Sequence, residues 1–342
     1  MRIVLDAMGS DQHPRPDVEG AVLAAREYGV IVVLVGQHSM ITSELAKHDT
    51  HGLEFEVVNA TEVVTMEDRP GAVLKSKPNS SMHVGMQLVA DGKADAFVTM
   101  GNTGAALSIA TLGPLRRVEG VKRPSLCAVI KLPSNTITLL DVGANADSKP
   151  EWLEQFAIMG SVYAERGLGI SNPRVALLSN GEEEGKGNDQ VRQTLPLLRQ
   201  APIHFIGNIE PKDVLRGGAD VIVADGFVGN VFLKTLEAGT GMVVSSLRDE
   251  LKRSVLSMIG AALSQSAFRR VRKALDPFEV GGAPLLGVNG VVIIGHGRTN
   301  ANGVKNGIRQ AKQAVEGQLI EQIRAGLTRA NAAVNGEHSA RE

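Results

Sequence analysis

The chain has 342 residues, a formal net charge of −1 and only 3% aromatic residues, which excludes a globally basic nucleic-acid-binding protein with base-stacking surfaces. The length allows one large or two ordinary domains. The single cysteine, Cys127, excludes a disulfide framework and a thiolate metal cluster. Because no apolar run approaches the roughly 20 residues needed to cross a bilayer, we expect a soluble cytoplasmic protein.

Short β-branched runs alternate with helical patterns from the N-terminus onward. The first residues, MRIVLDAMG, indicate a strand and a glycine turn rather than a signal peptide, and Asp17 is placed to cap the following helix. Further strands are predicted at Val30–Val35, Leu53–Val58 and Ala94–Thr99. This βαβα order predicts an α/β fold, an αβα layered sandwich in which helices cover both faces of a mostly parallel sheet.

Turns of small and polar residues follow two strands in the middle of the chain. The first turn comes after Ala94–Thr99 and consists of Gly101, Asn102, Thr103 and Gly104. The second, Asp141–Asp147, ends the strand Thr138–Val142 and contains Gly143 and Asn145. Between them lie a basic segment with Arg116, Arg117, Lys122 and Arg123, and a strand, Leu126–Ile130, that carries Cys127. We interpret Cys127 as a small core residue, because a lone cysteine in a strand usually is one.

The strand Arg174–Leu178 leads into a third turn, Asn180–Asp189, with Lys186 between two glycines and Asn188 near a helix start. A lysine in this position is a candidate phosphate contact. The glycine spacing, and Gly187 directly after the lysine, exclude a Walker A loop. The acidic triplet Glu182–Glu184 could bind Mg²⁺, but we favour a place in the first turn of a helix, where it would complement the helix dipole.

The stretch Asp220–Ala238 shows the same arrangement most clearly. Its β-branched run, Val221–Val223, suits a strand covered on both faces. Asp225, Gly226, Gly229 and Asn230 follow at the start of a helical pattern. Glycines allow close approach of the backbone to a ligand, and a helix N-terminus offers unpaired N–H groups to an anion. A tight turn with an Asp or Asn cap explains this stretch equally well when it is taken alone.

Residues 243–275 differ from the rest, because an apolar helical stripe runs into Ser254–Phe268, a stretch without charge. Basic residues flank that stretch on both sides. The candidate contact residues are Lys252, Arg253, Val255, Met258, Ile259, Leu263, Phe268, Arg269 and Arg270. The pattern fits an interfacial amphipathic helix or helical hairpin, and fits equally a dimerisation or core helix pair with a solvated basic rim. We expect it to protrude from a single catalytic domain, residues 1–328.

Towards the C-terminus we expect Glu279–Gly287 to be an irregular loop and Val291–Ile294 a strand. The strand ends in Gly295–Asn300, which contains His296. One helix, Gly303–Ala325, should complete the fold, and residues 329–342 should form a flexible tail because they are small and polar.

Five strand ends therefore carry glycine together with Asn, Asp, Lys or His. In a parallel sheet these turns would converge on one edge, where α/β proteins bind ligands. The resulting site would be rich in backbone N–H donors and poor in nucleophiles, since G-x-S-x-G, HExxH and G-x-G-x-x-G motifs are absent. Such a site suits binding of an anion and stabilisation of an oxyanion, more than a covalent enzyme intermediate.

Six motifs, in order from about Arg2 to Ala314, resemble the bacterial phosphate acyltransferases of phospholipid synthesis. They are DAMG from Asp6, GNTGA from Gly101, LDVGAN from Leu140, GEE from Gly181 with Lys186-Gly187, DGFVGN from Asp225, and GAPLLG from Gly282 through His296-Gly297. The resemblance implies a homodimer with a fold like those of phosphotransacetylase and the isocitrate and isopropylmalate dehydrogenases. It also implies transfer of a fatty acyl group from acyl-acyl-carrier-protein to inorganic phosphate.

The chemistry of the turns agrees with that reaction. Phosphate is an anion near neutral pH and needs no strong general base, and a thioester carbonyl needs an oxyanion hole and correct placement. Our hypothesis is that Asn102, Thr103 and Gly104 hold phosphate together with Lys186. Asn230 or His296 would polarise the carbonyl or protonate the leaving sulfur, and Asp225 would orient one of them, although His296 could equally be a satisfied strand-end histidine. The other expected substrate contacts are Gly101, Gly143, Asn145, Asn188, Gly226 and Gly229. No cofactor, metal or nucleic acid is expected.

The basic, apolar element at 243–275 could serve the acidic carrier protein, the bilayer, or both, which would make the protein peripherally membrane-associated and bring it near a membrane acyltransferase. Two alternatives remain open from the sequence. One is a nicotinamide-dependent decarboxylating dehydrogenase of the same fold, and the other is a membrane-surface scaffold without activity.

Overall fold

The computed structural model describes residues 1–132, 135–274 and 276–339. Its strands are short and mostly buried, as the β-branched runs predicted. They are β1 (Arg2–Asp6), β2 (Ile31–Gly36), β3 (Phe55–Asn59), β4 (Ala96–Thr99), β5 (Ser125–Lys131), β6 (Thr136–Leu140), β7 (Arg174–Leu178), β8 (His204–Ile209), β9 (Val221–Val223), β10 (Ala283–Leu286) and β11 (Val291–Ile294).

Most helices connect one strand to the next. They are α1 (Arg15–Tyr28), α2 (His38–Leu45), α3 (Pro70–Ser76), α4 (Ser81–Ala90), α5 (Thr103–Leu112), α6 (Pro150–Arg166), α7 (Asp189–Gln200), α8 (Pro211–Val214), α9 (Gly226–Leu251), α10 (Val255–Leu263), α11 (Gln265–Ala274), α12 (Ala301–Glu316) and α13 (Leu319–Ser339). A 3₁₀ turn, Pro277–Glu279, precedes β10.

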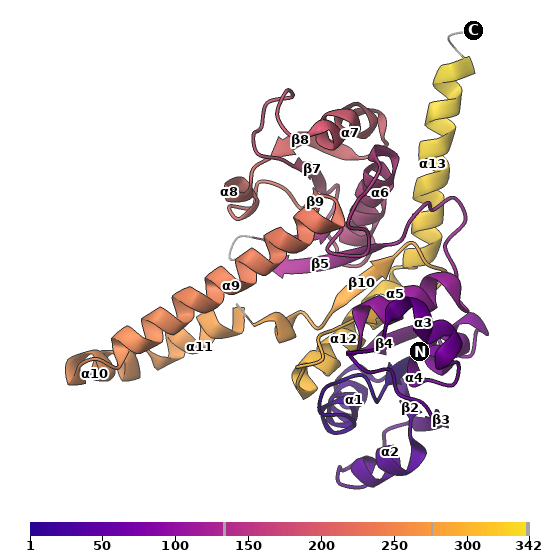
Figure 1. The fold of residues 1–342 in the computed structure, drawn as a ribbon. Helices are drawn as coiled ribbons and strands as arrows, with labels where there is room; N and C mark the ends of the chain where they lie inside the picture. Colours follow the sequence, from indigo (N-terminus) through magenta and orange to yellow (C-terminus); the bar gives the residue numbers. More distant parts are fainter. Residues whose placement is uncertain (133–134, 275, 340–342) are drawn as a thin grey trace.

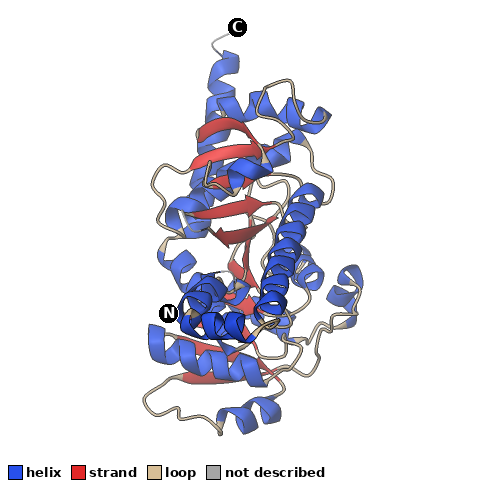
Figure 2. Cartoon of the chain, turned by 90° about the vertical axis from the view of Figure 1, so that its left-hand side faces the viewer, coloured by secondary structure: helices blue, strands red, loops and turns tan. Residues whose placement is uncertain are grey.

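The strands form one sheet in the order β3-β2-β1-β4-β11-β10-β5-β6-β9-β7-β8. Figure 2 shows them stacked along the long axis of the molecule. The expectation of an irregular loop at Glu279–Gly287 was wrong, because β10 lies within it and pairs antiparallel with both β11 and β5. The strand has only four residues, two glycines directly precede it, and it contains Pro284, which donates no ladder hydrogen bond, so sequence patterns do not reveal it.

The central strands divide the sheet into two halves that run in opposite directions. On one side β1, β2, β3, β4 and β11 are mutually parallel. On the other side β6, β7, β8 and β9 are mutually parallel. Because the pairs β11–β10, β10–β5 and β5–β6 are all antiparallel, three reversals separate the halves, and their strands point opposite ways.

Two apolar cores, one on each face, extend along both halves of the sheet. One core packs alternate strand residues such as Ile3 and Val221 against α1, α6, α12 and α13, whereas the other packs Val4 and Ile222 against α4 and α5. Successive strand residues point to opposite faces, so the β-branched runs fill both cores. The expected αβα sandwich is confirmed. Cys127 is fully buried in the first core, as expected.

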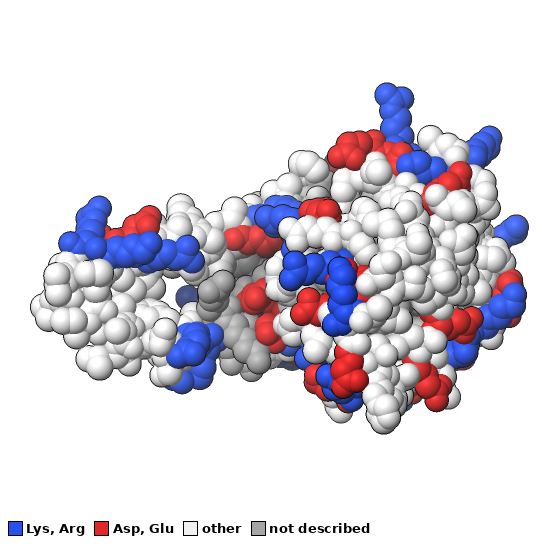
Figure 3. All heavy atoms as spheres, turned by 90° about the horizontal axis from the view of Figure 1, so that it is seen from below, with Lys and Arg blue, Asp and Glu red and all other residues white. Residues whose placement is uncertain are grey.

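The helices α9, α10 and α11 leave the sandwich as one long protrusion (Figure 1), which confirms the expected protruding element. Of the 26 residues of α9, only Gly226 and Gly229 are buried. At the tip, Leu256 is 81% and Leu263 83% exposed. Figure 3 shows the end of the protrusion as an uncharged surface bordered by Lys and Arg. None of the described helices is long and apolar enough to cross a membrane.

The C-terminal region contains two helices where one was expected. A break at Gly317 and Gln318, where Gln318 has a φ of 51°, separates α12 from α13. The helix α13 then continues to Ser339, through most of the segment for which we expected a flexible tail. Its first half packs Leu319, Ile323 and Leu327 into the core, so the helix is anchored well before that segment begins.

Candidate active site

We had expected the five turns to converge on one edge of the sheet, and this expectation was wrong. The turns after β4 and β11 lie at one edge of the sheet, and those after β6, β7 and β9 lie at the other. The cause is the reversal of direction through β10 and β5. The fold therefore divides the expected site residues between two groups of turns.

The first group consists of the turns that follow β1, β4 and β11. The amide of Asp11 donates to the carbonyl of Gly297 at 2.8 Å, and that of Gly295 donates to Thr99 at 2.8 Å. A methyl group on Gly9 would lie 2.9 Å from the Met100 nitrogen, so glycine is required for the turns to pack this closely. The three turns form one continuous surface.

Asn102 has a structural role in this group. Its side-chain oxygen accepts from the amide of Ala105 at 3.0 Å, and its amide donates to the carbonyls of Thr65, Met66 and Asp68. These bonds engage the side-chain amide, so the expected contact of Asn102 with phosphate stays a prediction that its side chain does not support. The backbone N–H groups of Thr103 and Gly104 precede the first intrahelical bond of α5 and remain available to an anion.

Two buried carboxyl groups lie beneath these turns. Asp6 accepts from the Thr99 hydroxyl at 2.8 Å, and Thr99 accepts from the amide of Gly101 at 3.1 Å. We had expected Asp17 to cap α1. It lies instead in the first turn of that helix and accepts a hydrogen bond from the Ser10 hydroxyl. Burial raises the pKa of both carboxyls, and that of Asp17 most strongly. The two groups thus fix the positions of the Gly9 and Gly101 turns.

Replacement of Asp17 by Asn should alter the pH dependence of stability. Because burial raises the pKa of Asp17 above its ordinary value of 3.8, the unfolded chain loses this proton first as the pH rises. Its stabilising contribution is complete below pH 3.8 and is lost progressively towards the higher folded pKa. Asn cannot ionise, so the Tm of Asp17→Asn relative to wild type should increase between pH 4 and pH 8. A constant difference over this range would contradict burial of a protonated Asp17.

The second group consists of the turns after β6 and β9. The carboxylate of Asp141 is fully buried and accepts from the amides of Leu126, Ala144 and Asn145 and from the Asn145 side chain. Burial nevertheless raises the pKa of Asp141. The carbonyl of Asn145 accepts from the amide of Gly226 at 2.8 Å. A methyl group on Gly143 would lie 3.6 Å from the Asn230 amide nitrogen, so Gly143 and Asn230 face one another.

Asp225 caps α9. Its carboxylate accepts from the amides of Phe227 at 3.0 Å and Val228 at 2.8 Å. It makes no direct hydrogen bond to Asn230 or His296 among the described residues, so the expected orienting role stays a prediction. What Asp225 orients is the helix itself, and with it every side chain that α9 presents.

Lys186 lies far from the Gly101–Gly104 turn. Six strand positions separate β4 from β7, and at about 4.8 Å for each position the two strand ends are about 29 Å apart. The lysine instead folds over Gly181. A phosphate site made of Thr103, Gly104 and Lys186 within one chain is therefore wrong.

The rest of that loop is also structural. Asn188 caps α7 by accepting from the amide of Val191 at 2.9 Å. The acidic triplet lies before α7 and not in its first turn, and Glu184 pairs with Arg199 near the other end of that helix. Among the residues that the structure describes, no group of three or more His, Cys, Asp or Glu side chains is arranged to hold a metal ion.

A single face of α9 connects the two groups. Asn230, Lys234 and Glu237 follow one another at helical spacing, over a rise of about 10 Å. Asn230 lies against Gly143. Lys234 and Glu237 lie close enough to His296 for their charges to shift its pKa. Although the ring of His296 reaches the surface, partial burial lowers its pKa, and the positive charges of Lys234 and Arg298 lower it further, against an opposing effect of Glu237.

Lys234 and Arg298 were not among the residues expected from the sequence. Lys234 seemed part of the helical pattern, and it does form an exposed pair with Glu237 at 2.9 Å. The available signal was its position four residues after Asn230, which places both on one helix face. Arg298 lies two residues after His296 in the same turn. The site that the fold assembles thus has Asn230 at one end and His296 and Arg298 at the other.

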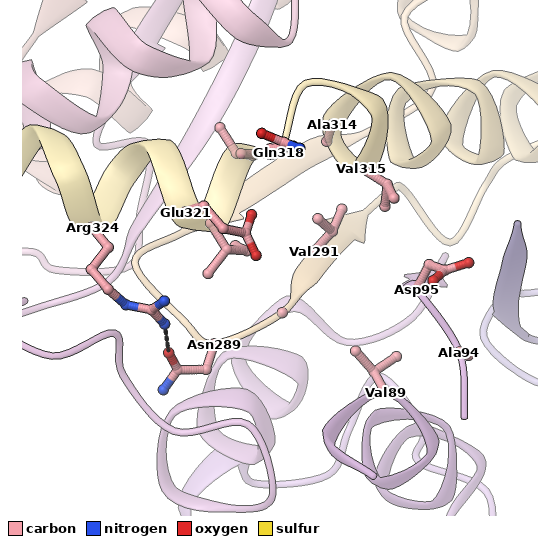
Figure 4. A pocket seen from close by; sticks show the side chains of 13 residues that line it. Val89, Ala94, Asp95, Asn289, Val291, Ala314, Val315, Gln318, Glu321 and Arg324 are labelled. Atoms are coloured by element: carbon pink, nitrogen blue, oxygen red, sulfur yellow. Dashed lines mark hydrogen bonds between the residues drawn. The ribbon is translucent and has the colours of Figure 1, made fainter. Parts of the chain in front are cut away.

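Two surface hollows lie elsewhere. One has a volume of about 530 Å³ and lies where β4 and β11 begin, between α4 and the α12–α13 junction (Figure 4). The other lies at the starts of β7 and β8. In Figure 4, Arg324 bonds to Asn289 at the rim of the first hollow. Neither hollow contains any of the expected site residues.

Comparison with known proteins agrees with this architecture. Residues 1–322 match the sequence model of a family described as "Fatty acid synthesis protein". Phosphate acyltransferases from Geobacter sp. (strain M21) and Pelotomaculum thermopropionicum are 46% and 45% identical, over 94% and 96% of this chain and 93% and 95% of their own lengths. The relative from Acidobacterium capsulatum is 46% identical over 94% of this chain and 96% of its own.

Solved structures show the same fold. A phosphotransacetylase from Streptococcus pyogenes superimposes with a TM-score of 0.61 at 18% identity and covers 94% of both chains. A branched-chain phosphotransacylase from Enterococcus faecalis gives 0.57 at 16% identity, over 92% of this chain and 99% of the other. The expected likeness to phosphotransacetylase is confirmed for the fold. By its sequence, and over nearly its full length, the chain belongs to the bacterial phosphate acyltransferases, a family of acyltransferase enzymes.

Proposed function

We propose that the protein transfers a fatty acyl group from an acyl-carrier-protein thioester to inorganic phosphate and supplies acyl phosphate for membrane phospholipid synthesis. Family membership supports acyl transfer to phosphate. The observation that carries the placement of the reaction is the face of α9, on which Asn230 and Lys234 connect the Gly143 turn to His296.

In this proposal phosphate binds at the first group of turns. The free amides of Thr103 and Gly104 at the start of α5 supply hydrogen bonds, and Arg298 and Lys234 supply positive charge. The segment from Thr65 to Asp68, held by Asn102, connects these amides to the Gly295–Asn300 turn: the Asn102 side chain reaches the Met66 carbonyl, and Gly297 lies against the Met66 side chain. The thioester then lies towards Asn230.

The reaction requires one bond to form and one to break. A phosphate oxygen attacks the thioester carbonyl, the carbonyl oxygen takes up negative charge, and the carbon–sulfur bond then breaks to release the carrier thiolate. No covalent bond to the enzyme is needed. Asn230 would donate to the developing oxyanion. The lowered pKa of His296 keeps its imidazole neutral near neutral pH. A neutral ring nitrogen can accept a hydrogen bond from a hydroxyl group of phosphate.

A direct assay tests the proposed reaction. Palmitoyl-carrier protein and phosphate are mixed with the protein, and acyl phosphate is trapped with hydroxylamine, while a parallel reaction with NAD is followed for hydride transfer. The proposal expects hydroxamate that depends on phosphate. Hydride transfer without hydroxamate would favour the dehydrogenase alternative, and neither product would favour an inactive scaffold.

We also propose that the protrusion meets the membrane surface and that the protein acts as a homodimer. Val255 and Ile259 on α10 are 68% and 54% exposed, and Arg269 and Arg270 on α11 are exposed beside them. On α9, Met242 and Val243 are 65% and 63% exposed. Exposed apolar area of this kind usually marks an interaction site. The tip suits a bilayer because a basic rim surrounds it, and the shaft suits a second copy.

Negative charge introduced at the tip should distinguish membrane contact by the tip from dimer contact by the shaft. Met258→Glu with Ile259→Glu should lower co-sedimentation with anionic phospholipid vesicles by at least about tenfold, since a buried carboxylate is costly in lipid. The molar mass in solution should stay that of wild type, because the shaft is unchanged. Wild-type partitioning of this variant would rule out membrane contact by α10. A changed mass would instead place the tip in the dimer interface.

A further inference from the structure

The loop between α5 and β5 carries four cations within eight residues. Arg116, Arg117, Lys122 and Arg123 are all exposed, and Glu119 is the only acidic residue among them. Four positive charges and one negative charge give the segment 116–123 a net charge of +3. None of the four forms an ion pair with a carboxylate in the part of the chain that the structure describes.

The loop is rigid although it lies at the surface. Gln155 of α6 accepts from the Lys122 amide at 2.8 Å and donates to the Gly120 carbonyl at 2.9 Å. Arg117 donates to the carbonyl of Lys122 and closes the loop. The guanidinium of Arg123 stacks over Trp152, 5.0 Å from the ring centre. These contacts hold the backbone of the loop and the side chains of Arg117 and Arg123 in place.

Arg116 has an unusual backbone conformation. Its φ is 60°, a region that costs residues other than glycine about 1–2 kcal/mol. Its amide donates to Ala110 at 2.9 Å, and its carbonyl accepts from Asn289 at 2.9 Å, so both neighbours hold this conformation. The side chain is exposed and makes no hydrogen bond within the described residues, so its charge is available to a partner outside the chain.

The loop lies directly beside the second group of turns. Its last residue before β5 is Pro124, whose carbonyl accepts from the Asn145 side chain at 2.7 Å. The carbonyl of Asn145 in turn accepts from Gly226 at the start of α9. Two hydrogen bonds, Asn145 to Pro124 and Gly226 to Asn145, therefore connect the end of this loop to the helix that carries Asn230.

The membrane-facing tip lies on a different side of the molecule. In Figure 1, β5 points from this loop towards the side on which the protrusion extends, and α10 lies at the far end of the protrusion. The apolar residues within the loop, Val118 and Val121, are buried, so the loop offers charge without an apolar surface. It is therefore suited to an acidic protein and not to insertion into lipid.

We propose that Arg116, Arg117, Lys122 and Arg123 form the docking surface for the acidic carrier protein that delivers the acyl thioester. This inference rests on the proposed function, because it concerns the donor in that reaction. The carrier docks on the loop, and its thioester reaches Asn230 past Gly143 and Asn145. Complementary charge of this kind mainly accelerates encounter and orients the partner.

Reversal of two of these charges tests the proposal. Arg116→Glu with Lys122→Glu removes exposed side chains that make no hydrogen bond or ion pair among the described residues, so the fold should be retained. Arg116→Ala with Lys122→Ala is a milder second variant. The KM for palmitoyl-carrier protein should rise at least about tenfold with kcat unchanged, and the defect should shrink at high salt. With a palmitoyl-pantetheine thioester as donor, the variant should behave as wild type.

Two further variants with the same change of charge serve as comparisons. Lys212→Glu on α8 with Arg216→Glu two residues after that helix should leave the KM for the carrier at its wild-type value. If Arg269→Glu with Arg270→Glu raises this KM and the loop variant does not, the carrier docks on the protrusion and the proposal is overturned. Equal loss with both donors in the loop variant would also overturn it. If wild type forms acyl phosphate from neither donor, the proposed function itself has failed.

Discussion

His296→Ala should lower kcat for acyl-phosphate formation by about 10²–10³-fold, the usual loss when one polar group at a transferring centre is removed. The Tm should change little, because the ring is exposed and makes no hydrogen bond among the described residues. Lys234→Ala should lower the same rate by a similar factor, since it lies on the α9 face that approaches His296. Steady-state kinetics and thermal unfolding of both variants measure this.

The pH dependence and two control variants sharpen the expectation. Burial, Lys234 and Arg298 lower the pKa of His296 below its ordinary value of 6.5. The imidazole is therefore mostly neutral at pH 6.5, and the rate component that depends on it should have its midpoint below that pH. Replacement of Lys234 should move this limb upward, towards 6.5. His204→Ala at the exposed start of β8 and Lys186→Ala should both stay near wild type. Collapse of activity in Lys186→Ala, with His296→Ala unaffected, would contradict this site.

Gly229→Ala should cost about 1–3 kcal/mol of stability and abolish activity. A methyl group there would overlap the carbonyl oxygen of Asp141, which is backbone and cannot move aside, and overpacking of this kind typically costs 1–3 kcal/mol. To relieve the overlap, α9 must move away from the Asp141–Asn145 turn and carry Asn230 and Lys234 with it. Urea unfolding and acyl-phosphate formation measure the two effects.

Gly239→Ala is the matched control on the same helix. A methyl group at Gly239 meets open space, so the substitution should stabilise α9 by about 0.5–1 kcal/mol through helix propensity, with activity retained. If Gly229→Ala is as stable and active as Gly239→Ala, the close packing of α9 on Asp141 is wrong.

The sequence predicts the individual strands and turns well, because each depends on local pattern. Val221–Val223 is β-branched and fully buried, and Asp225 directly precedes the helix that it caps. The direction of the strands relative to one another was not predictable in this way. It depends on three antiparallel pairs in the middle of the sheet. The two pairs made by β10, a four-residue strand with a proline, leave β11 and β5 running in the same direction, and the β5–β6 pair then turns the second half the opposite way.

The site was predicted less well, for a related reason. Asn102, Asn188 and Asp225 have the residue types of ligands, but all three cap helices, and only the hydrogen bonds of the folded chain show this. Lys186 has a favourable sequence setting, but its strand lies far from β4. Nothing in the sequence around Lys234 marks it as a site residue. It lies near His296 because α9 runs from the Gly143 turn towards the turn after β11. Long-range placement, which no local pattern contains, decides each case.

The central claim is that α9 joins the two groups of turns into one transfer site. A crystal structure of the protein with orthophosphate tests it most directly. The claim predicts phosphate bonded to the amides of Thr103 and Gly104, within reach of His296, Arg298 and Lys234. Phosphate bound beside Lys186, with the start of α5 empty, would contradict it.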